Sequence, residues 1–350
     1  MKIDFGSINR IVVRVPNWIG DVVMSIPALE ALKRNFPKSY LTVISKPWVK
    51  DLLIDHPSVS ELLIYSPERN ILQYLRTIFE IGSGIRQRDF DMAVIFQNAF
   101  EAAFLMWLGG VRIRVGYCTD GRGLFLTHSV PRPRQDQVTH QVEYYLNILR
   151  EMGLEAPSKA PVLVRRQDLG IAVRDMLRSS GFRQDHLTVG LGPGAMYGEA
   201  KRWPAERFAL VADMAAREWN ANILVLGSKK EKQIGDRVQR AMAHRCVNLC
   251  GKTSLSDAIE LLSICNFFVT NDSGLMHISA ALGVPTIAIF GSTDPHATGP
   301  LGPKTRVIQH QIDCAPCLRS TCPRDFRCML SIEASEVWDE LKRLRKEVEG

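Results

Sequence analysis

The sequence contains no long hydrophobic run. Its most apolar early stretch, residues 11–32, is interrupted by the charged side chains of Arg14, Asp21 and Glu30, whereas a membrane-spanning helix needs about 20 consecutive, mostly apolar residues. We therefore expect a soluble, cytoplasmic protein with no transmembrane helix and no signal peptide.

The sequence also lacks several well-known nucleotide-binding and hydrolase motifs. It has no Walker A loop, no nucleophile elbow with a serine, histidine and aspartate triad, and no three-glycine fingerprint after its first expected strand. The segment Asp89–Asp91 has the spacing of a metal-binding DxD motif, but it precedes its strand and so lies at the sheet edge away from ligands. An NAD-dependent oxidoreductase with twin Rossmann domains is therefore disfavoured, and we keep it as an alternative.

Positive charge is in excess. The chain has 44 Lys and Arg against 37 Asp and Glu, which gives a formal net charge of +7 and a pI of about 9.0. This excess suits an acidic partner, such as nucleic acid, an anionic membrane surface or a phosphorylated glycolipid. A basic, solvated surface explains the charge equally well.

Four of the eight cysteines lie close together in the sequence, at Cys314, Cys317, Cys322 and Cys328. Their spacing is compatible with tetrahedral zinc or with an iron–sulfur centre. A single pair has the tight two-residue gap, and nearby prolines can shape a loop without metal. In a reducing compartment we expect free thiols, and a structural zinc is the alternative.

Expected strands and helices alternate along the chain in two successive halves. In the first half the strands are expected at 10–15, 41–44, 61–65, 92–96 and 112–116, and the helices at 21–35 and 71–87. In the second half the strands are expected at 187–191, 222–226, 267–270 and 286–290, and the helices at 167–181, 205–219, 230–243, 256–265, 274–282 and 334–348.

Such alternation predicts parallel sheets covered by helices on both faces. We therefore expect an α/β protein with two Rossmann-like, doubly wound domains that face a central cleft. The domains are placed at 1–160 and 161–333. The last helix, 334–350, is expected to pack back toward the first domain.

A phosphate site is predicted where the strand 267–270 meets a helix. Asp272, Ser273 and Gly274 lie at this junction, where free backbone N–H groups and the helix dipole favour an anion. His277 lies one helical turn further on and can face the same anion. Ordinary capping of the helix by Asp272 or Ser273 is the alternative explanation.

A second loop is expected at the same sheet edge. Gly192–Ala195 follows the strand 187–191, and Lys201–Pro204 follows soon after. Lys201 is placed to act as a point charge on a diphosphate in place of a metal ion. A solvated surface lysine is the alternative.

Asp21 is expected at the start of the first domain's first helix, also at the carboxyl edge of its sheet. A carboxylate at a helix N-terminus stays ionised, as a general base must. The alternative is an N-cap aspartate without a chemical role.

Together these blocks resemble one family. Gly20–Asp21 before Ser25–Leu29, Pro193–Ala195 with Lys201–Pro204, and Asn271–His277 with Gly291–Pro295 are similar in order and spacing to the bacterial lipopolysaccharide heptosyltransferases, and most of all to heptosyltransferase II. The resemblance covers nearly the whole chain. It implies a GT-B fold, with an acceptor-binding first domain and an ADP-sugar-binding second domain.

The resemblance further implies inverting transfer of L-glycero-D-manno-heptose from ADP-heptose to the first heptose of the Kdo-lipid A inner core, with no cofactor. By position it makes Asp21 the base and Lys201 the phosphate ligand. It assigns the donor loop and the adenosine contacts to Asp272, Ser273, Gly274, His277, Glu231 and Thr253. Glu231 is aligned on a generic loop.

Basic residues of the first domain are candidates for the phosphates and carboxylates of the acceptor. These are Arg112, Arg114, Arg122, Arg132 and Arg134. Plain solvation explains them equally well. We expect a monomer that works at the inner face of the inner membrane and binds no nucleic acid. Another acceptor, or a non-catalytic nucleotide-sugar binding protein, remains an alternative.

Overall fold

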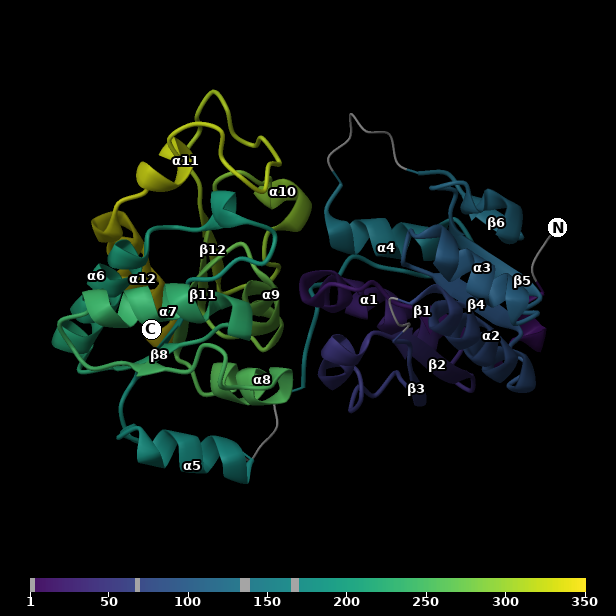
Figure 1. The fold of residues 1–350 in the computed structure, drawn as a ribbon, viewed down its shortest axis with the longest axis horizontal. Coiled ribbons are helices and arrows are strands. Elements are labelled where there is room, and N and C mark those ends of the chain that lie inside the picture. The colour runs from purple at the N-terminus through teal and green to yellow at the C-terminus, as the bar shows by residue number, and fades with distance from the viewer. Residues whose placement is uncertain (1–3, 67–69, 133–138, 165–169) are drawn as a thin grey trace. The chain divides into compact units, whose positions relative to one another are not determined.

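The computed structural model describes residues 4–66, 70–132, 139–164 and 170–350 of the chain. The chain divides into two compact units, Met1–Ala160 and Pro161–Gly350. Each unit is built on one parallel sheet with helices packed against it (Figure 1).

The first unit contains a sheet of order β3-β2-β1-β4-β5-β6. Its strands are β1 (Arg10–Arg14), β2 (Tyr40–Ser45), β3 (Glu61–Ile64), β4 (Met92–Ile95), β5 (Ile113–Tyr117) and β6 (His128–Val130). Its helices are α1 (Ile19–Asn35), α2 (Ile71–Gln87), α3 (Phe100–Leu108) and α4 (Gln141–Arg150), with short 3-10 turns η1 (Phe5–Ser7), η2 (Pro47–Leu52) and η3 (Arg122–Phe125).

The inner strands of this sheet are buried along most of their length, which explains their continuous apolar sequence. On one face, Val12, Ala93 and Ile95 form a core with the buried sides of α2 and α3. Helices α1 and α4 pack against each other. All five ladders of the sheet are parallel, so every strand ends at the same edge.

The second unit repeats this plan, with the order β12-β11-β10-β7-β8-β9. Its strands are β7 (Thr188–Gly192), β8 (Asn222–Val225), β9 (Val247–Asn248), β10 (Phe267–Asn271), β11 (Thr286–Ile289) and β12 (Thr305–Ile308). Its helices are α5 (Ile171–Ser179), α6 (Ala205–Trp219), α7 (Lys232–Ala241), α8 (Leu255–Ser263), α9 (Gly274–Ala281), α10 (Pro295–Thr298), α11 (Arg327–Leu330) and α12 (Ala334–Glu349), with 3-10 turns η4 (Glu199–Lys201) and η5 (Lys229–Glu231).

The order of strands confirms the predicted doubly wound α/β class. In each unit the first three strands run outward in one direction and the last three in the other, so the order reverses between β1 and β4 and between β7 and β10. Open sheets of this kind bind ligands beyond the carboxyl ends of the strands at the point of reversal. That rule directs attention to the loops that follow these four strands.

The closing helix belongs to the second unit. Val337, Trp338 and Leu341 of α12 are buried in the core of this unit, where α12 packs on α6 and β11. The Trp338 ring lies 4.6 Å from the ring of Trp219 at the end of α6. The apolar stripe of α12 is thus covered within the second unit, and the expectation that this helix packs back toward the first domain stays a prediction.

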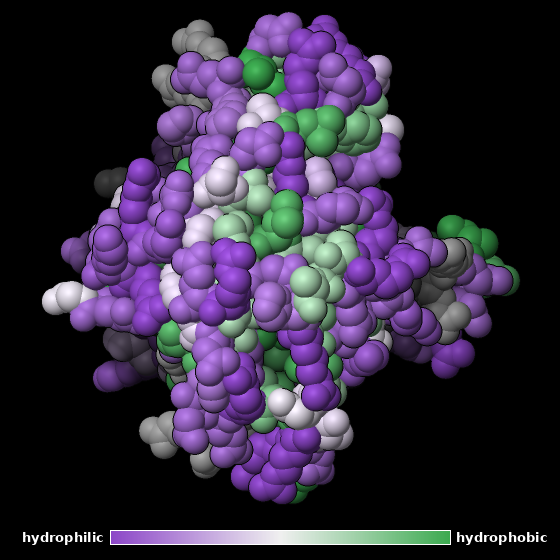
Figure 2. Space-filling view, turned by 90° about the vertical axis from the view of Figure 1, so that its left-hand side faces the viewer, coloured by the Kyte–Doolittle hydropathy of each residue, from purple (hydrophilic) through white to green (hydrophobic). Residues whose placement is uncertain are grey.

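Among the described residues, no helix combines the length and the apolarity that a bilayer crossing requires. Figure 2 shows one face of the molecule, on which hydrophilic residues (purple) predominate and hydrophobic residues (green) show between them, mainly toward the middle of the view.

Candidate active site

The two loops predicted to bind the donor do meet, at the carboxyl ends of β7 and β10. The Asn271 side chain at the end of β10 joins them, because its Nδ2 donates to the Pro193 carbonyl at 2.8 Å and its Oδ1 accepts from the Trp203 N–H at 3.0 Å. Gly192 is needed at this junction, since a Cβ there would come within 2.5 Å of Thr270 Oγ1. The loops after β7 and β10 are therefore joined side by side at one edge of the sheet.

Lys201 forms an ion pair at this edge. Its Nζ lies 2.5 Å from Asp272 Oδ2, and the two side chains are 12% and 5% exposed. Thr293, which follows β11, donates from Oγ1 to the same carboxylate oxygen at 2.7 Å. Lys201 Nζ also lies 4.8 Å from the centre of the Tyr197 ring. The lysine is thus fixed in a mostly buried position, unlike a solvated surface lysine.

The start of α9 is arranged for an anion. Ser273 is the N-cap residue with extended backbone, but its side chain makes no capping hydrogen bond. Its hydroxyl instead lies 3.2 Å from Thr270 Oγ1. Asp272 is occupied by Lys201 and Thr293, so neither residue provides the side-chain cap of the alternative interpretation. The N–H groups of the first turn of an uncapped helix attract negative charge. His277 is buried in α9 one turn further on.

Glu231 lies beside the loop that follows β7. It is buried, and its Oε2 accepts the Ser228 N–H at 2.7 Å in a capping box. A Cβ at Gly194 would overlap the Glu231 carboxyl group, which explains the glycine there. The structure therefore brings Glu231 to the donor edge even though its sequence context is generic. Thr253 is partly buried between β9 and α8, at the outer strand of this sheet.

Asp21 lies in the first turn of α1, directly after the loop that follows β1. Trp18 is the N-cap residue of this helix and makes no side-chain capping bond. Burial, the nearby Asp21 carboxylate and a side-chain hydrogen bond with Asp21 raise the pKa of Tyr145 on α4 well above its ordinary value. Asp21 is therefore a partly buried carboxylate at the point where the order of the first sheet reverses.

The arginines of the first unit are not gathered into one acceptor site. Arg112 precedes β5 and is exposed, so it lies at the amino edge of the sheet. Arg114 donates to the carbonyls of Val111 and Phe125, and its guanidinium is therefore engaged near the same edge. The prediction that these two residues face the acceptor is not supported by their positions.

Arg122 is at the carboxyl edge but fully buried. Its guanidinium donates to the carbonyls of Tyr117 and Gln97 and to the Asn98 side chain, which ties together the chain beyond β4 and β5. Its visible role is to hold these loops. Arg132 lies among the described residues, and Arg134 lies outside them.

The four clustered cysteines line one cavity of about 240 Å3, together with Ala200 and Ser292 of the loops beside Lys201. Cys317 is exposed and Cys328 is buried, and all four are free thiols. Burial and the neighbouring Cys322 sulfur raise the pKa of Cys328. Within the described ranges, no three His, Cys, Asp or Glu side chains are positioned to hold a metal ion.

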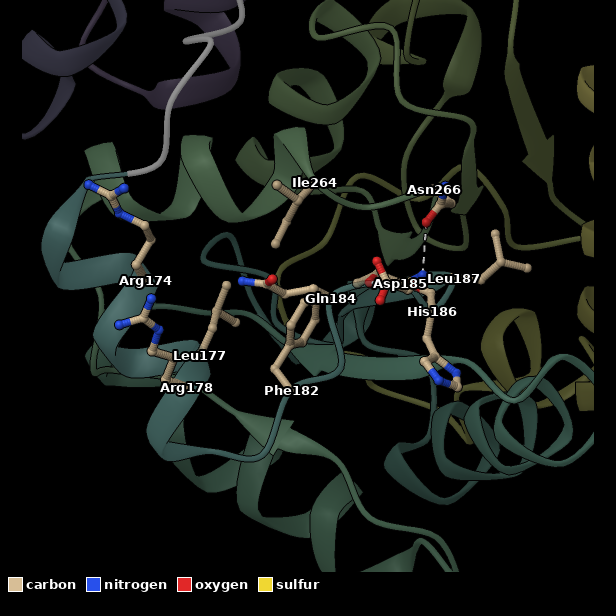
Figure 3. A pocket seen from close by; sticks show the side chains of 11 residues that line it. Arg174, Leu177, Arg178, Phe182, Gln184, Asp185, His186, Leu187, Ile264 and Asn266 are labelled. Atoms are coloured by element: carbon tan, nitrogen blue, oxygen red, sulfur yellow. Dashed lines mark hydrogen bonds between the residues drawn. The ribbon is translucent and has the colours of Figure 1, made fainter.

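Two other features lie at the amino edges of the sheets. Asp91 of the DxD-like segment accepts the N–H groups of Asn9 and Arg10 at 2.8 and 2.9 Å, so it anchors the start of β1. A cavity of about 650 Å3 lies under α5, where Asn266 accepts the Thr188 N–H at 2.8 Å (Figure 3). Asn266 precedes β10 and Thr188 begins β7, so this cavity lies at the amino edge of the second sheet, away from Lys201.

Thr293, Tyr197 and Asn271 also lie at this edge. Asn271 and Thr293 stand in the blocks that carry the family resemblance, but the sequence assigned none of the three an individual role. A signal for Thr293 was present, because it follows a buried strand at the same sheet edge as Asp272. Tyr197 carries no such signal, since its ring reaches Lys201 through the irregular loop before η4.

Comparison with known proteins gives one consistent result. The family model described as glycosyltransferase family 9 (heptosyltransferase) matches residues 78–326. The chain is 31% identical over 304 residues to the lipooligosaccharide heptosyltransferase 2 of Haemophilus influenzae, which covers 84% of this chain and 86% of that protein. It is 28% identical over 308 residues to the lipopolysaccharide heptosyltransferase 2 of Escherichia coli, with 86% and 88% covered.

A solved structure agrees with these relatives. The E. coli ADP-heptose LPS heptosyltransferase II superposes with a TM-score of 0.82 at 26% identity, over 97% of this chain and 100% of that one. A family 9 glycosyltransferase from Veillonella parvula shares the fold with a TM-score of 0.87 at 23% identity, over 99% of each chain. The resemblance that the motifs suggested is thereby confirmed, and the chain belongs to glycosyltransferase family 9, the heptosyltransferases.

Proposed function

We propose that the chain transfers L-glycero-D-manno-heptose from ADP-heptose to the first heptose of the lipopolysaccharide inner core, with inversion and without a metal ion. The relatives named heptosyltransferase 2, matched over most of their length, support the reaction. The observation that carries it is the paired Lys201 beside the uncapped start of α9, which suits a diphosphate leaving group. In this proposal the first unit binds the acceptor and the second binds the donor.

The reaction is a single displacement. Asp21 accepts the proton of an acceptor heptose hydroxyl while that oxygen forms a bond to the anomeric carbon of the donor. The bond between the anomeric carbon and the diphosphate oxygen breaks at the same time, and ADP leaves from the opposite face. Contact with Tyr145 limits the movement of the Asp21 side chain, and a fixed base is an efficient one.

Negative charge on the departing diphosphate is stabilised in the second unit. Lys201 supplies a full positive charge, and the N–H groups at Ser273 and Gly274 supply hydrogen bonds that strengthen as the charge develops. Asp272 and Thr293 hold Lys201 in place before the donor arrives. His277 orients the phosphates, and Glu231 and Thr253 contact the adenosine.

The acceptor is a glycolipid, so the enzyme works at the cytoplasmic face of the inner membrane as a peripheral monomer. The net charge of +7 favours association with an anionic surface. No cofactor takes part, and the cysteine cluster stays outside the reaction, as reduced thiols or around a structural zinc.

The decisive experiment replaces Asp21 by Asn, which keeps the size of the side chain and removes its basicity. Transfer, followed as ADP release and as the mass of the lipid product, should fall by about 10²- to 10⁴-fold, the usual contribution of a general base. Thermal stabilisation by ADP-heptose should be retained. Glu30→Gln is the matched control, because Glu30 lies in the same helix and pairs with Lys159 at the surface. Substantial transfer by the Asp21→Asn variant would remove Asp21 from the role of base.

A further inference from the structure

Two tryptophans at the carboxyl edge of the first sheet are exposed. Trp18 follows β1 and is 62% exposed, and Trp48 follows β2 and is 55% exposed. Large aromatic side chains in this position lose favourable burial, so they commonly serve to bind a partner that covers them. The strands β1 and β2 are neighbours in register, so both rings extend from the same part of the edge.

One of these rings is fixed to the loop that leads to Asp21. Trp48 Nε1 donates to the Asn17 carbonyl at 2.7 Å, and Arg14 Nη2 donates to Asn17 Oδ1 at 2.8 Å. Trp18 is three residues before Asp21 and occupies the N-cap position of the same helix. Trp48 is therefore anchored to the loop that carries Trp18 and leads into the first turn of α1, where Asp21 lies, so a sugar on these rings would lie at the same end of this helix.

Positive charge gathers around the Tyr65 ring, which directly follows β3 at the same edge of the sheet. Lys46 Nζ lies 4.3 Å and Arg14 Cζ 5.5 Å from the centre of the same ring, Tyr65. In the described part of the chain, Glu101 is the carboxylate that acts on both cations, and it also accepts a hydrogen bond from Tyr74. Of the carboxylates that the structure describes, Glu101 is thus the one that both cations share.

The two cations differ in what they can reach. Arg14 is 2% exposed and its Nε has no hydrogen-bond partner among the described residues. Lys46 is half-buried and forms no ion pair within the described ranges. Burial and the nearby Arg14 lower the pKa of Lys46, as expected for a cation without sufficient counter-charge. An anion bound at Lys46 would supply counter-charge to Lys46 and Arg14.

We propose that Trp18, Trp48 and Lys46 form the acceptor subsite, in which a sugar ring lies on the tryptophans and Lys46 binds an anionic oxygen of the glycan, from a phosphate or a carboxylate. This inference rests on the proposed function, because it assumes that the acceptor binds the first unit and that Asp21 is the base. Arg14 acts as a positioning residue that fixes Asn17 and, through it, Trp48.

The test compares acceptor and donor kinetics of four variants. Lys46→Gln, Trp48→Ala and Trp18→Ala should each raise the KM for heptosyl-Kdo-lipid A by about tenfold or more, and leave the KM for ADP-heptose within twofold. Trp48→Phe keeps a ring but loses the bond to Asn17, so its effect should be smaller than that of Trp48→Ala. Because Trp18 makes no capping bond, Trp18→Ala keeps the test available if a Trp48 variant does not fold.

Matched controls exist in the same unit. Lys50→Gln removes an exposed lysine four residues after Lys46, and Trp107→Ala removes a tryptophan that is 48% exposed at the far end of α3. Both should keep the KM values of the wild type. Equal acceptor KM values for Lys46→Gln, Trp48→Ala, Trp18→Ala and the wild type would overturn the subsite.

Altered acceptors identify the anion. If Lys46 binds a phosphate, dephosphorylated acceptor should abolish the difference between wild type and Lys46→Gln, whereas acceptor with reduced carboxylates should preserve it. The reverse pattern assigns a carboxylate. A difference that persists with both acceptors would overturn the role of Lys46. Failure of the proposed function is distinguishable, because the wild type would then release no ADP with any of these acceptors.

Discussion

The ion pair between Lys201 and Asp272 allows a quantitative prediction. The two side chains are almost entirely buried, and their charged atoms are 2.5 Å apart. In the Lys201→Met variant the Asp272 carboxylate stays buried. Among the described residues it keeps the hydrogen bond from the Thr293 hydroxyl but loses its cation. Removing one member of a buried pair costs about 3 to 5 kcal/mol, because the other charge stays buried without compensation. Asp272→Asn should cost a similar amount for the same reason.

The double variant separates pairing from packing. With Lys201→Met and Asp272→Asn together, no charge is left unpaired, so the loss of stability should be clearly smaller than the sum of the two single losses. In a unit of this size, 1 kcal/mol shifts the melting temperature by about 2 to 4 °C. Each single variant should therefore melt about 6 to 20 °C lower in calorimetry, with a partial recovery in the double variant.

The same lysine is expected to bind the donor. A hydrogen bond to a charged group contributes about 1.5 to 3 kcal/mol, so Lys201→Met should lower kcat/KM by about 10- to 150-fold. At an ADP concentration of about 100 times the wild-type Kd, the nucleotide stabilises the wild type by about 2.7 kcal/mol. A 100-fold weaker Kd reduces this to about 0.4 kcal/mol. Strictly additive stability losses, together with wild-type kcat/KM, would refute both roles of Lys201.

Three further predictions concern other parts of the chain. Burial lowers the pKa of His56 below 6.5, so its contribution to stability is present above pH 6.5 and is lost as the pH falls through the folded-state pKa. Between pH 7 and 5 the wild type should therefore lose stability faster than the His56→Gln variant, by at most about 1.4 kcal/mol per pH unit. Melting temperatures that fall in parallel for the two proteins would contradict this. Iodoacetamide at pH 8 should modify the exposed Cys317 long before Cys265, because burial raises the pKa of the Cys265 thiol to about 12. The modification is followed by mass spectrometry. If added zinc protects Cys317 from the reagent, a structural metal is favoured over free thiols. Binding to vesicles of anionic lipid should weaken as salt rises from 0.05 to about 0.5 M, because screening removes the attraction of a +7 protein, and salt-independent sedimentation would argue against an electrostatic association.

The fold was predictable because its strands are short apolar runs that recur between amphipathic helices. The helices α2 (Ile71–Gln87) and α6 (Ala205–Trp219) begin and end at the residues expected from their periodicity. Helix α3 was missed, because Phe100–Leu108 is apolar on nearly every side and has no side-chain N-cap, so it shows no helical period. Strand β9 was missed because it has only two residues, Val247 and Asn248.

That Lys201 and Asp272 lie at one edge was predictable for a different reason. Asp272 and Lys201 are 71 positions apart in the sequence, yet each follows a strand of the same parallel sheet, and carboxyl ends of parallel strands share an edge. Their mutual ion pair was not predicted. Nothing in the local sequence indicates that the carboxylate turns away from its own helix to reach Lys201, because that choice depends on the distant Thr293.

The acceptor arginines were chosen without reference to the sheet edge, and their assignment stays a prediction. Arg112 and Arg114 were selected for their charge alone, although Arg112 precedes its strand and so lies at the amino edge. Applied to the same domain, the rule rejects Arg112 and selects residues directly after β1 and β2, among them Lys46 and Trp48. We therefore expect position relative to the end of a strand to be a better guide to acceptor contacts in this fold than charge, and acceptor kinetics of the Lys46 and Trp48 variants test that expectation directly.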